Sequence, residues 1–313
     1  MKIAIREAYG QALLEYGREN EDVVVLDADV SGSTKSALFK KEFPDRFFNV
    51  GIAEANMTAM AAGFAAAGKI PFVNSFAAFV STLGLLPARA FASYSKLPIK
   101  LMGAYGGLSD AFDGPSHHAI EDIAIMRALP SLKVYVVSDV AQTRWAVRHA
   151  IEDKSPMYIR LSRDYFPDQY ASGETFCDGK AKLLAEGGDV TIIACGLMVG
   201  HAVAAAESLK AEGISARVVD MFTIKPLDSE IVLESAAKTG AIVTAEEHSV
   251  IGGLGGAVCE ALCEGAASVP LTRVGMADRH AECGPYAKLL RKYGLDRDAI
   301  VAAVKKTLAK KQL

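Results

Sequence analysis

The sequence predicts an α/β protein with two doubly wound domains. Short apolar runs alternate with helical patterns along the 313 residues, which is typical of mostly parallel sheets with helices on both faces. The alternation stops between Asp164 and Gly188, a segment rich in Pro, Gly, Ser and Asp. This composition indicates a linker or a long loop between the two domains.

Apolar runs in the first half predict buried strands. These runs are Val23–Leu26, Pro71–Val73, Ile99–Met102, Val134–Val137 and Met157–Leu161. Helical patterns lie between them, at about Glu54–Ala67, Thr82–Ser95, Ile120–Ala128 and Ala141–Ile151. Because helical crossovers join parallel strands, we expect one mostly parallel sheet here.

A second alternation follows the linker and predicts a second sheet. Its strands are Val190–Ala194, Ala216–Val219, Ala241–Thr244 and Leu271–Val274, and Ala181–Ala185 can pair as a further strand. Its helices are Val199–Gly213, Ser229–Lys238, Gly256–Glu264, Pro285–Lys292 and Asp296–Lys310. A chain of this length can bury a sizeable core.

The composition argues against several classes of protein. A net charge of −3 disfavours a nucleic-acid binder that relies on a basic face. The longest weakly polar stretch, Thr58–Gly68, is far shorter than the roughly 20 residues of a membrane span. No apolar secretory segment follows Met1, and the five cysteines contain no CxxC. We therefore expect a cytoplasmic protein that binds neither nucleic acid nor membranes.

Two short motifs in the first half have both a structural and a functional interpretation. Glu54 begins a helix of small and apolar residues, where spacing alone favours a glutamate that complements the helix dipole over a catalytic one. Phe76 and Phe79 are three residues apart at the start of the next helix. They either pack in the core or form an aromatic wall for a flat heterocycle.

The segment Gly106–His118 is dense in Gly, Asp and His and follows a strand, where α/β proteins place ligand sites. Asp113 and His117 could act as an acid/base pair. Asp113, His117 and His118 could instead bind a metal ion, although neighbouring histidines on an irregular loop make poor joint ligands. A plain structural turn is the third possibility.

Two further motifs are a pair of arginines at the end of a strand and a glycine-rich segment in the second half. Arg160 and Arg163 end a strand, and alternation places them on opposite faces, so that one can enter the cleft as an anion clamp. Gly252–Gly256 opens a helix after a strand. Because Val258 stands where GxGxxG requires its third glycine, a glycine-rich helix start is a better interpretation than a dinucleotide site.

In this order, the motifs resemble the transketolase family of thiamine diphosphate enzymes, and more closely the C-terminal subunit of a split transketolase. The matching strings are Gly51–Glu54, Phe76 with Phe79, Asp113–His117, Leu161–Arg163, Val218–Met221, Ile224–Asp228 and Glu246–Ser249. The resemblance implies a pyrimidine-binding domain at residues 1–165, a linker at 166–184 and the family's C-terminal domain at 185–313.

The resemblance also implies roles for individual residues. The carboxyl of Glu54 would bond N1′ of the cofactor's aminopyrimidine and so promote formation of the thiazolium ylid. Phe79 would stack on the pyrimidine, with Phe76 alongside it. Asp113 and His117 would contact the sugar hydroxyls, and His117 would assist proton transfer. The other family positions on the substrate side are Arg6, Asp29, Ser33, Tyr105 and Arg163.

Half of the cofactor site is missing from the sequence. In the family, Mg²⁺ (or Ca²⁺) holds the diphosphate through a Gly-Asp-Gly motif and an asparagine further along the chain. Asp-Gly occurs here at Asp113 and Asp178, but no asparagine follows Asn74. The resemblance therefore implies no metal site in this chain. It implies an N-terminal, diphosphate-binding partner subunit in an α2β2 heterotetramer, with a place in pentose phosphate metabolism.

Three positions depart from the family pattern. Tyr105 replaces a phosphate-contacting His, Phe112 replaces a Glu, and Thr82 replaces an aromatic residue. The expected reaction is ketol transfer from a ketose to an aldose, with a ketose phosphate or a sugar with another acidic end as donor. The alternatives are a deoxyxylulose-phosphate-synthase-like enzyme, a 2-oxo acid dehydrogenase β subunit, and a non-catalytic assembly subunit.

Overall fold

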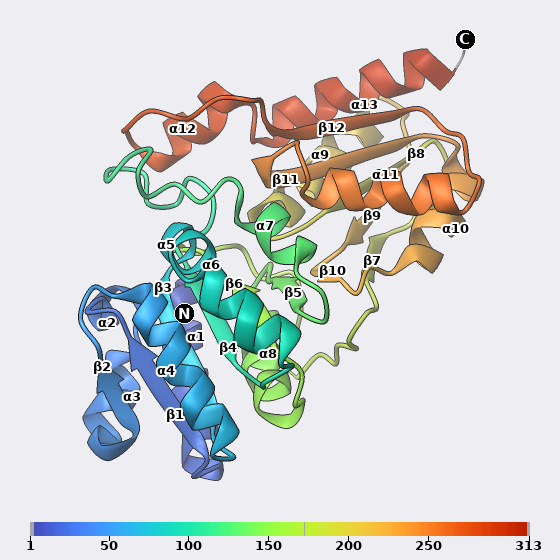
Figure 1. The fold of residues 1–313 in the computed structure, drawn as a ribbon. Helices are drawn as coiled ribbons and strands as arrows, with labels where there is room; N and C mark the ends of the chain where they lie inside the picture. Colours follow the sequence, from blue (N-terminus) through green and yellow to red (C-terminus); the bar gives the residue numbers. More distant parts are fainter. Residues whose placement is uncertain (1–2, 172, 312–313) are drawn as a thin grey trace.

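The computed structural model describes residues 3–171 and 173–311. Two mixed sheets organise these residues, one of seven strands and one of five, which confirms the predicted α/β class with two domains. Each sheet is parallel except for one edge strand. Figure 1 shows the first sheet in the lower part of the view and the second above it.

The first sheet has the strand order β10-β5-β6-β4-β3-β1-β2. Its strands are β1 (Val23–Asp27), β2 (Phe47–Asn49), β3 (Ile70–Phe76), β4 (Lys100–Ala104), β5 (Lys133–Val136), β6 (Met157–Arg160) and β10 (Thr223–Lys225). The five predicted strands are all present. The sequence pattern misses β2 because three residues show no period, and it misses β10 because that strand crosses from the second half to pair antiparallel with β5.

The helices of the first half cover both faces of this sheet (Figure 1). They are α1 (Ile5–Glu19), α2 (Ser31–Thr34), α3 (Ala37–Glu42), η1 (Pro44–Arg46), α4 (Glu54–Ala66), α5 (Ala77–Thr82), α6 (Leu85–Pro87), η2 (Ala88–Tyr94), α7 (Asp122–Ala128) and α8 (Val140–Glu152). The pattern overlooks α1, whose buried face includes Gly10 and Gly17. Gly17 is required by close packing, since a Cβ there would lie 2.4 Å from the ring of Phe39.

The continuous helix predicted over Thr82–Ser95 is wrong. The segment is broken into the end of α5, the short α6 and η2, which is a π-helix. Gly84 separates the first two pieces, and a Cβ at Gly84 would lie 2.6 Å from the carbonyl oxygen of Val80. Pro87 lacks the N–H that a continuous helix would use.

The second sheet has the strand order β12-β11-β8-β9-β7. Its strands are β7 (Lys182–Ala185), β8 (Val190–Ala194), β9 (Ala216–Asp220), β11 (Ile242–Ser249) and β12 (Leu271–Met276). Its helices are α9 (Leu197–Ala211), α10 (Ser229–Thr239), α11 (Leu254–Glu264), α12 (Tyr286–Tyr293) and α13 (Arg297–Lys311). Gly253 caps α11, so the predicted glycine-rich helix start is confirmed.

One hydrophobic cluster joins the two sheets. It contains Met57 and Ile123 from the first half together with Met221, Leu254 and Val258 from the second. The two halves therefore share apolar packing in addition to the pairing of β10 with β5. Among the residues with described structure, no helix is long and apolar enough to cross a membrane.

Candidate active site

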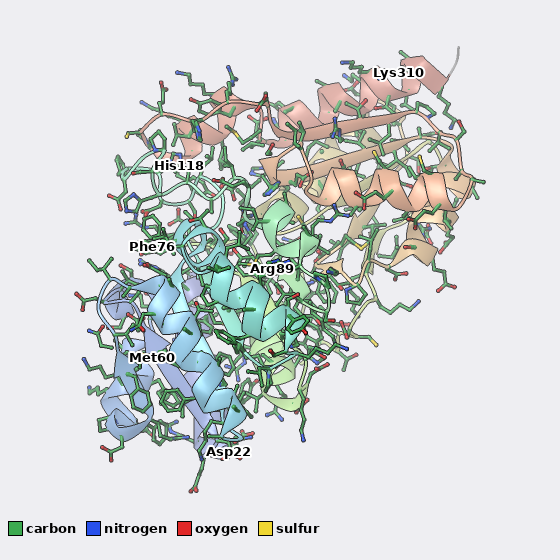
Figure 2. All side chains as sticks on the ribbon, in the orientation of Figure 1. Asp22, Met60, Phe76, Arg89, His118 and Lys310 are labelled. Atoms are coloured by element: carbon green, nitrogen blue, oxygen red, sulfur yellow. The ribbon has the colours of Figure 1, made fainter. Side chains whose placement is uncertain are left out.

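The carboxyl ends of β1, β3, β4 and β6 meet at one edge of the first sheet, because these strands are parallel neighbours. Open α/β sheets bind ligands at this edge. Phe76 is the last residue of β3, Tyr105 directly follows β4, and Arg163 lies three residues after β6. Figure 2 shows Phe76 and His118 between the upper end of this sheet and α12.

Glu54 is the first residue of α4 and is buried, with 3% of its surface exposed. Its Oε1 accepts a hydrogen bond of 2.7 Å from the hydroxyl of Ser75, the penultimate residue of β3. The predicted start of the helix at Glu54 is therefore confirmed, and Ser75 is a neighbour that the motif did not reveal. Because the bond to Ser75 uses one carboxylate oxygen, the other is available for a hydrogen bond with a ligand.

Four rings gather where β3 and β4 end. Phe76 and Phe79 have ring centroids 5.9 Å apart, and Phe76 stacks on Tyr105 at 4.7 Å with 17° between the planes. The imidazole of His117 meets Phe79 edge-on at 5.0 Å and Phe76 at 5.8 Å. The two phenylalanines are only partly buried, and Phe79 also packs against the small apolar cluster of Ala77, Ala78 and Ala119, so each side chain keeps some surface exposed.

Two guanidinium groups converge on Tyr105. Nη1 of Arg6 donates to the Tyr105 hydroxyl and, at 3.4 Å, to the carbonyl oxygen of Ser33. The Cζ atoms of Arg6 and Arg163 lie 5.5 Å and 5.2 Å from the centroid of the Tyr105 ring. Nε of Arg6 is buried and has no partner within the described structure. Two positive charges with an unused donor form a binding site suited to an anion.

Arg160 and Arg163 diverge as the alternation predicts. The guanidinium of Arg160 is buried, with an ion pair of 2.8 Å between its Nε and Asp122. Arg163 remains partly exposed, and its Nη1 lies 2.9 Å from Oδ1 of Asp110. Arg163 therefore lies at the edge of the first sheet beside the Tyr105 ring, whereas Arg160 belongs to the buried contact between the two sheets.

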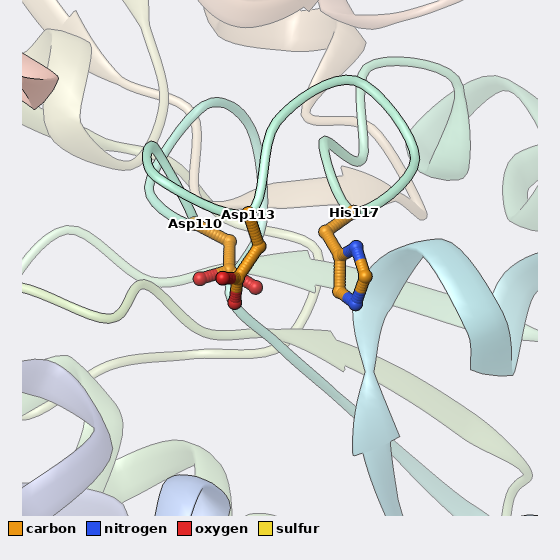
Figure 3. Close-up of side chains that lie close together, drawn as sticks. All are labelled: Asp110, Asp113 and His117. Atoms are coloured by element: carbon orange, nitrogen blue, oxygen red, sulfur yellow. The ribbon is translucent and has the colours of Figure 1, made fainter. Parts of the chain in front are cut away.

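The loop from Gly106 to His118 brings together Asp110, Asp113 and His117, each with one polar atom within 4.8 Å of the others (Figure 3). Asp110 is buried, and this desolvation together with the charge of Asp113 raises the pKa of Asp110 to about 6, although Arg163 opposes the shift. The sequence analysis did not single out Asp110. Its spacing of three residues from Asp113 in a glycine-rich loop was the available signal.

The alternative metal trio of Asp113, His117 and His118 does not form. His118 is buried and is not part of the cluster, and its ring interacts with the backbone of Asp110 and Ala111 instead. Burial lowers the pKa of His118, which favours the neutral ring. The third member of the observed cluster is Asp110 in place of His118. The negative charge of Asp110 is already paired with the positive charge of Arg163.

Asp29 and Ser33 lie beyond the end of β1 at the same edge. Asp29 adopts a left-handed backbone conformation with φ of 65°, and its Oδ1 accepts a hydrogen bond of 2.8 Å from Asn49 at the end of β2. Ser33 lies in α2, where its carbonyl oxygen faces Arg6. Six of the seven substrate-side residues named from the sequence thus lie in segments that follow the strands at this edge, and Arg6, at the start of α1, reaches the same edge through Tyr105.

The fold and this site define a two-domain chain of the transketolase type. Residues 1–169 match the family model of the transketolase pyrimidine-binding domain, and residues 179–300 match that of the transketolase C-terminal domain. The chain therefore belongs to the transketolase family.

Three similar proteins are named as a section, a subunit or a split-gene form of a transketolase. The putative transketolase C-terminal section of Methanocaldococcus jannaschii is 44% identical over 98% of this chain and 96% of its own length. The 6-deoxy-6-sulfo-D-fructose transketolase subunit SqwH of Clostridium sp. is 43% identical over 98% and 95%. A solved structure described as a split gene transketolase, inactive beta4 tetramer, is 49% identical with a TM-score of 0.90, over 99% of this chain and 100% of that one.

Proposed function

We propose that this chain is the C-terminal subunit of a two-subunit transketolase that transfers a two-carbon ketol unit from a ketose to an aldose with thiamine diphosphate. The observation that carries the proposal is the buried carboxyl of Glu54, held to the end of β3 through Ser75, with the partly exposed rings of Phe76 and Phe79 following directly in the chain. A carboxyl next to aromatic faces fits an aminopyrimidine, which needs a proton at a ring nitrogen and a flat surface to stack on.

Thiamine diphosphate, when bound, supplies a nucleophilic thiazolium carbon for the transfer. Glu54 holds a proton against N1′ of the pyrimidine, and Ser75 fixes the orientation of the carboxylate through its hydrogen bond of 2.7 Å. Burial of Glu54 keeps water away from that proton and strengthens its electrostatic effect on the ring. Phe79 stacks on the pyrimidine, and Phe76 extends the surface toward Tyr105.

In this proposal the sugar substrate binds next to the aromatic rings, beside His117 and Tyr105. His117, in edge contact with both phenylalanines, contacts the sugar hydroxyls together with Asp113 and assists their proton transfers. Arg6, Tyr105 and Arg163 bind the acidic end of the sugar, with Ser33 and Asp29 at the margin of the same site. The unpartnered Nε of Arg6 supports an anionic group at this position.

The identity of the donor depends on three departures from the family pattern. Tyr105 offers a hydroxyl but no positive charge at neutral pH, whereas a histidine could offer one. Phe112 is 68% exposed, and Thr82 gives its hydroxyl to the carbonyl of Ala78. We propose a donor with a phosphate or another acidic end, and the relative that acts on 6-deoxy-6-sulfo-D-fructose supports a sulfonate as one such end.

The second half of the cofactor site belongs to a partner in this proposal, an N-terminal subunit that binds the diphosphate through Mg²⁺ or Ca²⁺. Large apolar side chains beside Glu54 and along the adjoining short helices are left uncovered: Ile52, Leu83, Leu86 and Tyr94 are 82%, 56%, 74% and 86% exposed. Leu83 and Leu86 are only three residues apart in the chain, and exposed apolar side chains grouped in one short segment are typical of a protein interface. The description of a similar tetramer of one subunit type as inactive also supports a required partner, in an α2β2 complex.

The decisive experiment combines this chain with the protein encoded beside it, chosen for a Gly-Asp-Gly motif and a downstream asparagine. We expect ketol transfer from xylulose 5-phosphate or a sulfonated ketose to ribose 5-phosphate, dependent on thiamine diphosphate and Mg²⁺. The expected compartment is the cytoplasm, in keeping with five free cysteines. Full activity of this chain alone would contradict the split-subunit proposal, and no transfer from any ketose would contradict the reaction.

A further inference from the structure

The loop that carries Asp110, Asp113 and His117 is held at both ends by the second half of the chain. At its start, the backbone N–H of Leu108 donates to Oε1 of Glu247 at 2.7 Å. Beyond its end, the N–H of Ser249 donates to the carbonyl oxygen of Ile120 at 2.7 Å. Glu247 and Ser249 both belong to β11, so one strand of the second sheet fixes both ends.

The middle of the loop also touches the second half. The N–H of Gly284 donates to the carbonyl oxygen of Ala111 at 3.1 Å, and a Cβ on Gly114 would lie 2.3 Å from Sγ of Cys283. In Figure 1 the loop between β4 and α7 runs directly beneath α12. The segment with the catalytic candidates is therefore contacted at both ends and in its middle by residues that are far away in sequence.

Glu247 makes the contact that lies closest to the site. Its side chain is 3% exposed, and its Oε1 accepts both from Leu108 and, at 2.9 Å, from the hydroxyl of Tyr286 in α12. A Cβ on Gly107 would lie 2.3 Å from Cδ of Glu247, and Gly107 has a φ of 66°. Glycine at 107 is needed both for this backbone conformation and for the close approach of the carboxylate.

A second interaction connects Glu247 to the same loop through Arg160. Nη2 of Arg160 donates to the carbonyl oxygen of Glu247 at 2.9 Å and to that of Ala119 at 2.8 Å. The backbone and the side chain of Glu247 thus hold opposite ends of one loop. A loop tied at both ends loses conformational freedom along the whole segment between them.

We propose that Glu247 is a positioning residue of the active site: its carboxylate fixes Gly107 and Leu108, and through them the loop that carries Asp110, Asp113 and His117. The inference rests on the proposed function for its catalytic meaning, but the structural effect is measurable without it. It assigns the second domain a direct part in shaping the site, in addition to its packing role.

The test compares Glu247→Ala with Glu247→Gln, which keeps an acceptor oxygen, and with Glu246→Ala as the matched control. Glu246 is a neighbouring buried glutamate whose carboxylate accepts from Leu254 and Gly255 at the start of α11 instead. In hydrogen exchange on the full chain, Glu247→Ala should speed the amides of residues 107–118 by about tenfold. In Glu247→Gln, the exchange rates of these amides should stay within about threefold of wild type. In Glu246→Ala, exchange should instead become faster at the start of α11.

In the complex with the partner subunit, Glu247→Ala should raise the donor KM by about tenfold while the Kd for thiamine diphosphate stays within about twofold. Unchanged exchange at 107–118 in Glu247→Ala would overturn the proposal, as would a Gln variant equal to the Ala variant. If Glu247→Ala does not fold, Glu247→Asp takes its place, since its side chain is one methylene shorter and its carboxylate cannot reach Leu108 in the same way. Glu247→Asp must then also speed amide exchange at residues 107–118. A wild-type complex without ketol transfer would refute the proposed function and leave the exchange result standing.

Discussion

The phenol ring of Tyr105 lies stacked on the ring of Phe76, with 4.7 Å between the centroids and 17° between the planes. The contact joins the end of β3 to the residue after β4, so the aromatic surface of Phe76 and Phe79 continues to Tyr105, which the guanidinium groups of Arg6 and Arg163 face. Arg6 donates to the hydroxyl of the same Tyr105. One side chain thus connects the two halves of the proposed site, which makes its substitution informative.

Tyr105→Phe should lower kcat/KM for acidic donors by about tenfold, because Arg6 loses its hydroxyl partner while the stack on Phe76 remains. The Kd for thiamine diphosphate should not change. Tyr105→His should shift the preference among ketose phosphates and sulfonated ketoses, since it adds a group that can carry charge. Steady-state kinetics over a panel of donors measures both effects. An unchanged preference in Tyr105→His would contradict the assigned role of this position.

Arg163 and Asp110 form an ion pair of 2.9 Å, and this pairing predicts non-additive substitutions. Arg163→Met should raise the donor KM by about tenfold or more, because it removes a positive charge and leaves the buried Asp110 unpaired. Adding Asp110→Asn to Arg163→Met should restore part of the lost folding stability but should leave the donor KM high. A double-mutant cycle in thermal unfolding and in kinetics separates the two. Strictly additive stabilities would show that the pair is not coupled.

Glu54→Gln should reduce ketol transfer by at least about 100-fold, since the amide keeps the hydrogen bond to Ser75 but cannot hold the shared proton. Assembly with the partner subunit should remain intact by size-exclusion chromatography. Glu264→Gln, at the exposed end of α11, is the matched control and should show wild-type rates. Wild-type rates in Glu54→Gln would refute the proposed proton role.

The uncovered apolar residues predict where the partner subunit binds. Leu86→Asp should weaken assembly with the partner by at least about tenfold, because Leu86 is 74% exposed in this chain and a charge would be buried on binding. Leu183→Asp offers a matched control on the edge strand β7, where leucine is 38% exposed. Analytical ultracentrifugation of the mixed subunits gives both values. If the two variants assemble with the partner equally well, the interface does not include Leu86.

The buried carboxyl of Glu246 predicts a loss of stability with rising pH. Burial raises its pKa from 4.5 to about 7, although the N–H groups of Gly255 and Leu254 oppose the shift. The folded chain therefore binds this proton more tightly than the unfolded chain does. Its contribution to stability is complete below about pH 4.5 and is lost as the pH rises through about 7.

This sign can be checked by urea unfolding at several pH values. The midpoint of the wild type should fall between about pH 5 and about pH 8, and Glu246→Gln, which cannot titrate, should show a flatter profile. Glu207→Gln, at an exposed position of α9, should keep the wild-type slope. A Glu246→Gln profile as steep as that of the wild type would assign the effect to other groups.

Local sequence patterns predicted most of the regular structure. The strand runs were recovered because a buried parallel strand is continuously apolar over several residues, as in Val23–Asp27 and Val190–Ala194. The pattern failed where an element is too short to have a period, as for β2, and where glycine and proline divide a helix, as after Gly84. The antiparallel strand β10 joins the sheet of the other domain, which no local pattern encodes.

The sequence by itself determined the chemistry that is available: Glu54 at a helix start, two phenylalanines three residues apart, and a loop with Asp113 and His117. These residues were recoverable because each lies in a short motif with its own spacing. Only the tertiary structure brought Asp110 to Arg163, Tyr105 to Phe76 and Glu247 to Leu108. Those pairs are separated by 53, 29 and 139 residues, and such contacts exist only after parallel strands place their carboxyl ends at one edge and the second sheet closes over it.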